Sequence, residues 1–149
     1  MSLQEIRESI LTAHAWLREQ IERLHALAKI ELESQGPDHQ IRSKIVDFCD
    51  ALRGHIDVEE ELLRPVLQQL DAWGDARVER LEEDHRQQRL RIAQIRHLAR
   101  DMSFSLLDLA GVCKEFLEEL EMDMQREERD ILAEDIFRDD ALSVHQVSG

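Results

Sequence analysis

The sequence contains no tyrosine, and aromatic residues make up only 4% of its 149 residues. Glycine and proline are also scarce, with 5 and 2 copies, and this favours long helices over a sheet of short strands. The start of the chain has no basic leader before an apolar core, and no apolar run approaches membrane-spanning length. We therefore expect one domain in the cytoplasm, with no membrane contact.

Basic residues are outnumbered, with 19 Lys and Arg against 33 Asp and Glu, which gives a formal net charge of -14. This charge repels nucleic acid and anionic membrane surfaces, so neither is expected as a partner, whereas a homo-oligomer stays open. The two cysteines, Cys49 and Cys113, match no disulfide framework and no paired zinc motif. We expect them to be reduced thiols in the core.

Helix-breaking residues fall at 35–38, 73–75 and 101–105, and they divide the chain into four segments of helical length. Short connections make consecutive helices antiparallel neighbours. The sequence therefore predicts an all-α, up-down-up-down four-helix bundle over residues 1–138, with a polar C-terminal tail over 139–149.

Each segment carries an apolar stripe in steps of three and four residues. The stripes consist of Leu3, Ile6, Ile10, Leu17, Ile21, Leu24 and Ala28; of Ile41, Ile45, Phe48, Leu52, Leu62, Val66 and Leu70; of Val78, Leu81, Ile92, Ile95 and Ala99; and of Leu106, Leu109, Cys113, Phe116, Leu120 and Ile131. Near its middle each stripe is interrupted by residues that can bind a metal: His14, then His55 and Glu59, then His85, then Asp123 and Glu127.

Six such groups on four stripes indicate a shared site, because burying unpaired carboxylates and imidazoles is costly. A spacing of four residues places His55 and Glu59 on one helix face, and Asp123 and Glu127 repeat this spacing. Imidazole and carboxylate together suit iron, manganese or zinc, and a carboxylate can bridge two ions. We expect two iron ions, with a single ion or a metal-free bundle as the alternatives.

The positions of these groups along the bundle axis agree less well with a single shared site. Counted from the break at 35–38, His14 lies nearly level with His55 and Glu59, whereas His85 and the residues of the last segment are offset by a turn or two. We expect helix tilt and unequal connections to absorb this offset.

The stretch from His55 to Pro65 resembles the HxxxEE-x-LxxP signature of the hemerythrin-like, or HHE cation-binding, domain family. The His in the first segment, Glu83-Asp84-His85 and the Glu127-Glu128 pair also match that family. The resemblance implies that His14, His55, Glu59, His85 and Glu127 bind an oxo- or hydroxo-bridged diiron centre. It further implies that the centre binds oxygen or nitric oxide, or reports on iron or redox state.

Two positions depart from the family pattern. Arg89 stands where the third helix often has a second histidine, and Asp123 stands where the motif of the fourth helix begins with histidine. An aspartate still binds metal and makes the site harder and more anionic, whereas an arginine cannot bind metal. Arg89 either points inward and forms a buried ion pair with Glu59 or Glu127, or points outward into solvent.

Other functions have less support in the sequence. A ferritin-like centre would use Glu22 and His25 with Glu82 and His85, but Glu22, His25 and Glu82 lie off the stripes. A metal-free or single-metal bundle acting as a structural or protein-interaction module explains the helices but not the layer of buried polar groups. An oxidase or peroxidase activity would need an open coordination position, and no residue indicates a substrate. The remaining histidines, His39, His97 and His145, are expected at the surface.

Overall fold

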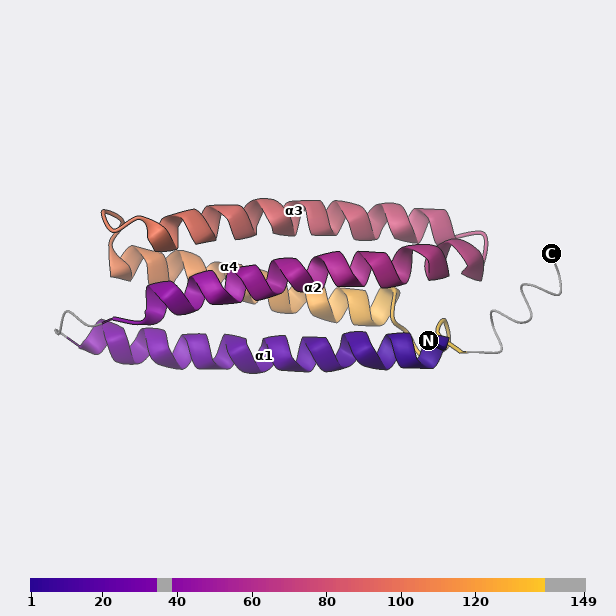
Figure 1. Ribbon diagram of the computed structural model, residues 1–149, viewed down its shortest axis with the longest axis horizontal. Coiled ribbons are helices and arrows are strands. Elements are labelled where there is room, and N and C mark those ends of the chain that lie inside the picture. Colours follow the sequence, from indigo (N-terminus) through magenta and orange to yellow (C-terminus); the bar gives the residue numbers. More distant parts are fainter. Residues whose placement is uncertain (35–38, 139–149) are drawn as a thin grey trace.

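The computed structural model describes residues 1–34 and 39–138, and this part of the chain contains four helices and no strand. They are α1 (Leu3–Glu33), α2 (Ile41–Leu70), α3 (Gly74–Arg100) and α4 (Leu106–Asp130). The helices run alternately up and down, and each packs against the next, with α4 returning to α1 (Figure 1). The predicted four-helix bundle is confirmed.

The helix boundaries agree with the sequence pattern where they can be compared. Serine hydroxyls cap two helices, because Ser2 accepts from the backbone N–H of Glu5 and Ser105 accepts from that of Asp108, both at 3.1 Å. The break at 101–105 is confirmed, whereas the break predicted at 73–75 lies at 71–73, because α2 ends at Leu70 and α3 already begins at Gly74. The break at 35–38 and the tail at 139–149 lie outside the described residues.

The turn between α2 and α3 requires glycine at position 74. A Cβ atom added there would lie 2.0 Å from the carbonyl oxygen of Leu67, so any side chain would push the two helices apart. Gly74 therefore lets α3 begin directly against α2.

A buried carboxylate joins the end of α1 to the start of α2. Glu31, which is 6% exposed, accepts hydrogen bonds from the backbone N–H groups of Gln40 and Ile41, the latter at 2.8 Å. The side chain of Gln40 makes no cap hydrogen bond at the start of α2. Glu31 of α1 therefore accepts from the backbone N–H groups there, which have no partner within the helix. At the same end of the bundle, Arg42 donates to backbone carbonyls that follow α3, including that of Asp101 at 3.0 Å.

We expect Glu31→Ala to lower the free energy of unfolding by about 1–3 kcal/mol, because two backbone donors lose a charged acceptor. Urea denaturation followed by circular dichroism measures this loss. Glu33→Ala is the matched control, since Glu33 is exposed two residues further on. An equal loss in both variants would contradict the capping role.

The core consists of two apolar clusters separated by a polar layer. The larger cluster lies toward the end of the bundle that holds Ile41 and Leu109. The smaller cluster consists of Leu3, Ile6, Ile10, Leu63, Leu67, Leu70, Val78, Leu81, Ile131, Leu132 and Phe137. Residues 131–137 continue past α4 and cover this end, where the carbonyl of Leu132 accepts from Arg7 at 2.6 Å.

One part of the predicted stripe on α2 is wrong. Leu63 and Leu67 are fully buried, whereas the predicted Leu62 and Val66 are only partly buried. The buried track follows Ile56 and Glu59 and keeps its steps of three and four residues from there. His55 lies one residue before the buried Ile56. A stripe continued from His55 in steps of three and four therefore names residues one position before the buried ones.

Both cysteines are free and buried, as expected, and burial raises the pKa of the Cys113 thiol to about 11. None of the helices in the described part of the chain has an apolar stretch that would let it cross a bilayer.

Candidate metal centre

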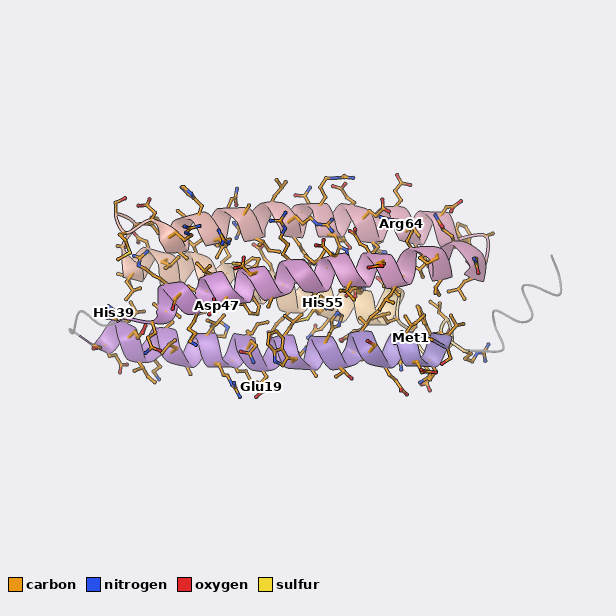
Figure 2. The ribbon with its side chains drawn as sticks, in the orientation of Figure 1. Met1, Glu19, His39, Asp47, His55 and Arg64 are labelled. Carbon is orange, nitrogen blue, oxygen red and sulfur yellow. The ribbon has the colours of Figure 1, made fainter. Side chains whose placement is uncertain are left out.

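The polar layer between the two clusters contains residues from all four helices. His14 on α1, Glu59 on α2 and His85 on α3 are each 1% exposed. Glu127 on α4 and His55 on α2 are also largely covered, with side chains 11% and 14% exposed. Figure 2 shows His55 near the middle of α2 on the side facing α1, whereas Glu19 of α1 points away from the bundle.

Glu59 lies at the centre of this layer, and its two oxygens face different histidines. Glu59 Oε2 lies 2.7 Å from His55 Nε2 and 3.3 Å from His14 Nε2. Its other oxygen, Oε1, lies 3.0 Å from His85 Nε2. Glu59 therefore lies between an α1–α2 group, formed with His14 and His55, and an α3–α4 group, formed with His85 and Glu127.

Glu127 approaches the same two groups from the opposite side. Its Oε1 atom lies 3.3 Å from His14 Nε2, and its Oε2 atom lies 3.6 Å from His85 Nε2. Two carboxylates thus lie between the same pair of imidazoles, the arrangement in which carboxylates bridge two cations. The ligand atoms of these residues converge despite the predicted offset in height, because those within each group lie within 4.8 Å of one another.

The outward-facing nitrogen of each central histidine has a carboxylate partner. His14 Nδ1 lies 2.8 Å from Glu128, and His85 Nδ1 lies 3.0 Å from Glu60. A carboxylate only accepts, so both Nδ1 atoms donate, and in the neutral imidazole the Nε2 lone pair points into the centre. This is the carboxylate–histidine arrangement that orients histidine ligands in metal proteins.

Two arginines hold the outer carboxylates in place. Arg18 donates to both oxygens of Glu128, at 3.0 and 2.8 Å. Arg89 donates to Glu60 at 3.0 Å and to Asp57 at 2.9 Å, and its side chain is 36% exposed. Arg89 therefore points outward and orients Glu60, so it does not occupy the centre as a buried ion pair.

Asp123 is the predicted ligand that the structure keeps apart. Its carboxylate accepts from Gln88 at 3.3 Å, lies 3.6 Å from Arg126 and belongs to neither ligand group. Burial raises the pKa of Asp123. The structure brings together His14, His55, Glu59, His85 and Glu127, and the metal-binding role of Asp123 stays a prediction.

Sequence reasoning did not assign the outer residues Glu60, Glu128 and Arg18. The sequence did contain a signal for them. Glu59 and Glu127 are each followed directly by a second glutamate, and His14 and His85 are each followed four residues later by an arginine. On a helix, the neighbour of an inward residue points about 100° away from it and can reach the adjacent helix.

The charges of the centre depend strongly on one another. Burial alone lowers the pKa of His14, but its hydrogen bonds and charge interactions with Glu127 and Glu59 outweigh burial and raise the pKa to about 10. His85 behaves in the same way, with a pKa of about 10. Burial raises the pKa of Glu59, but hydrogen bonds from three imidazoles hold it well below its ordinary value. Burial and the charge of Glu59 raise the pKa of Glu127.

The donor set fits cations between the imidazoles and the carboxylates. Two donor atoms about 2.1 Å from one ion, at an angle of about 90 to 110°, lie about 3.0 to 3.4 Å apart. The Nε2 atoms of His14 and His85 lie 3.0 to 3.6 Å from the oxygens of Glu59 and Glu127. Glu127 Oε1 is also buried, and no donor among the described residues meets it with the geometry of a regular hydrogen bond, although His14 Nε2 lies 3.3 Å away.

We expect Glu128→Gln to weaken metal binding by about 10- to 100-fold, because a neutral amide orients and polarises His14 less effectively than a carboxylate. Competition with a chelator of known affinity measures the change. Glu118→Gln on the exposed face of α4 is the control and should bind metal as the wild type does. Equal affinities in the two variants would show that Glu128 does not act on the centre.

Comparison with known protein families supports the geometric result. The sequence profile of the hemerythrin HHE cation-binding domain matches residues 5–134, which include α2, α3, α4, all but the first two residues of α1, and every residue of the polar layer. Searches of the curated proteins and of the solved structures found no match to this chain. Because the profile covers most of the sequence, the chain belongs to the hemerythrin HHE cation-binding domain family.

Proposed function

We propose that this protein holds two iron ions in the polar layer and uses them to bind oxygen or nitric oxide, or to report on iron or redox state. One observation carries the proposal: Glu59 and Glu127 each lie between His14 and His85. A carboxylate pair placed in this way suits two ions better than one, because each carboxylate has one oxygen for each ion.

The residues of the polar layer would have different roles in such a centre. His14 and His55 would bind one ion, His85 would bind the other, and Glu59 and Glu127 would join them. When bound, two irons supply redox change and open coordination positions for a small ligand. Glu60 and Glu128 hold the imidazoles, while Leu17, Leu52, Leu120 and Met124 line the centre and limit its contact with water.

The size of the centre favours a very small ligand. The cavity enclosed by the ligand residues measures about 10 Å³, close to the space of one water molecule. An organic substrate does not fit beside the metal positions without movement of the helices. Binding or sensing of a diatomic molecule therefore has more support than oxidation of a larger substrate.

A metal-free structural bundle is the second candidate, and one observation favours it. Protonated His14 and His85 would each carry a positive charge next to Glu59 and Glu127, and such a network is self-sufficient. In that case, the outer carboxylates would serve stability alone. Manganese or zinc would suit the same donor atoms, so the identity of the metal needs a direct measurement.

The test is anaerobic loading with ferrous iron, followed by metal analysis and an absorption spectrum before and after exposure to air. About two irons per chain, with oxo-bridge absorption after exposure to air, are the expected results. Parallel loading with manganese and zinc shows whether iron is preferred. One ion per chain would overturn the two-iron proposal, and no bound metal would favour the structural bundle.

A further inference from the structure

The second half of the bundle repeats the first half around the centre. His14 and Arg18 of α1 correspond to His85 and Arg89 of α3, and the glutamate pair of α2 corresponds to that of α4. The contacts repeat as well, because each histidine donates through Nδ1 to a glutamate that an arginine holds. The two halves therefore supply the centre with matching sets of residues.

Many core residues follow the same correspondence, and of those given next all are buried except Ala28, which is partly buried. Ile10, Ile21, Leu24 and Ala28 of α1 correspond to Leu81, Ile92, Ile95 and Ala99 of α3; Ile41, Ile45, Phe48, Cys49, Leu52, Ile56 and Leu63 of α2 correspond to Leu109, Cys113, Phe116, Leu117, Leu120, Met124 and Ile131 of the second half. At these positions an apolar residue of one half corresponds to an apolar residue of the other half. A position near the centre where the two halves differ in residue type therefore departs from this correspondence.

Two exceptions occur at the centre, and they lie next to each other. Leu17, which is 1% exposed, corresponds to the polar Gln88, and the ligand His55 corresponds to Asp123. Gln88 donates to Asp123 at 3.3 Å. The α3–α4 half therefore lacks one imidazole and one apolar side chain at the same place.

The pockets around the centre differ in the same way. An outer pocket of about 60 Å³ between α3 and α4 is lined by Gln88, Leu120 and Asp123, among others. Gln88 and Leu120 also line the inner cavity, so these two side chains form the wall between the centre and this pocket. The pocket between α1 and α2 shares no lining residue with the inner cavity.

We propose that a small ligand enters between α3 and α4, past Gln88 and Asp123, and binds on the His85 side of the centre. This inference rests on the proposed function, because it needs metal at the centre. The α1–α2 group offers two imidazoles beside the buried, apolar Leu17, whereas the α3–α4 group offers one imidazole beside the polar Gln88. A half with fewer ligands keeps a coordination position for a molecule from outside.

The ligand class follows from the size and polarity of the wall. The inner cavity of about 10 Å³ is the space in which the ions would lie, so only a molecule of the size of water or of a diatomic gas could be added beside them without movement of the helices. The Gln88 amide can donate a hydrogen bond to such a molecule if it releases Asp123. The two side chains would therefore act as entry and positioning residues, and His85, Glu59 and Glu127 would hold the ion.

The test follows nitric oxide binding to the ferrous-loaded full chain by stopped-flow absorption. Gln88→Leu installs the residue that stands at the corresponding position of the other half, and we expect it to slow binding at least tenfold with unchanged iron content. Asp123→His installs the missing imidazole, and we expect it to reduce the amount of nitric oxide bound at saturation. Gln20→Leu is the matched control in the α1–α2 pocket and should not change the rate.

The outcomes separate the two proposals. Normal iron content together with unchanged nitric oxide binding in both Gln88→Leu and Asp123→His would overturn the entry route and leave the diiron function intact. A slower rate in Gln20→Leu alone would place entry between α1 and α2 and overturn it as well. Absence of bound iron in the wild-type protein would overturn both proposals.

Discussion

Replacing Glu59 by glutamine is expected to remove both metal ions from the centre. Glu59 is the one residue that belongs to both ligand groups, and its oxygens face His14, His55 and His85. The substitution keeps the size of the side chain but removes the negative charge that two cations would share. Metal analysis after loading and desalting should fall from about two ions per chain to fewer than one.

A matched control separates this effect from a general loss of acidic charge. Glu61→Gln changes the same residue type two positions along α2 on the exposed surface, and it should bind metal normally. Circular dichroism would show whether the helices of Glu59→Gln remain formed. A folded Glu59→Gln protein that still holds two ions would contradict the bridging role of this carboxylate.

The metal-free protein should lose stability as the pH rises from about 6.5 to about 10. The pKa values of His14 and His85 are raised from 6.5 to about 10 in the fold, so each imidazole takes up a proton more readily there than in the unfolded chain. This contribution is fully present below pH 6.5 and is lost as the pH rises through the folded pKa. The melting temperature of the chelator-treated protein should fall across this range.

Metal loading should change this behaviour, because a bound cation replaces the proton on each imidazole. Affinity should therefore increase with pH over the same range, and loading at pH 7 should release protons from His14 and His85. Calorimetry in two buffers of different ionisation enthalpy measures the proton release. A chelator-treated protein whose melting temperature stays constant between pH 6.5 and 10 would show that these imidazoles are not protonated in the fold.

The fold could be predicted because its determinants are local. Steps of three and four residues identified the stripes, and Gly74 marked the turn between α2 and α3, whereas the break at 101–105 was marked by serine and aspartate. The stripe was wrong at Leu62 and Val66 because a ligand such as His55 can lie beside the buried track. Glu31 was missed because the donors that it caps lie on the next helix, and nothing in a local pattern reveals that contact.

The inner ligands could be named from the sequence because each interrupts an apolar stripe. Their surroundings could not, because the direction of a long side chain depends on the adjacent helix. Arg89 could have faced Glu59 or solvent, and the position of Glu60 on α2 decides that it faces outward. Asp123 has the same spacing to Glu127 as His55 has to Glu59, yet its side chain is shorter than histidine and its carboxylate is held by Gln88. Spacing alone does not distinguish these outcomes.

The smaller apolar cluster draws its residues from both ends of the described chain, from Leu3 to Phe137, and it borders the polar layer. A change in charge at the centre therefore affects the packing of the neighbouring apolar cluster, because closely packed interiors transmit strain. The first helix and the segment that follows α4 are held together there by packing and by the hydrogen bond from Arg7 to the carbonyl of Leu132. A fluorophore pair placed on these two segments would measure whether filling the centre changes the distance between them, with no label near the metal.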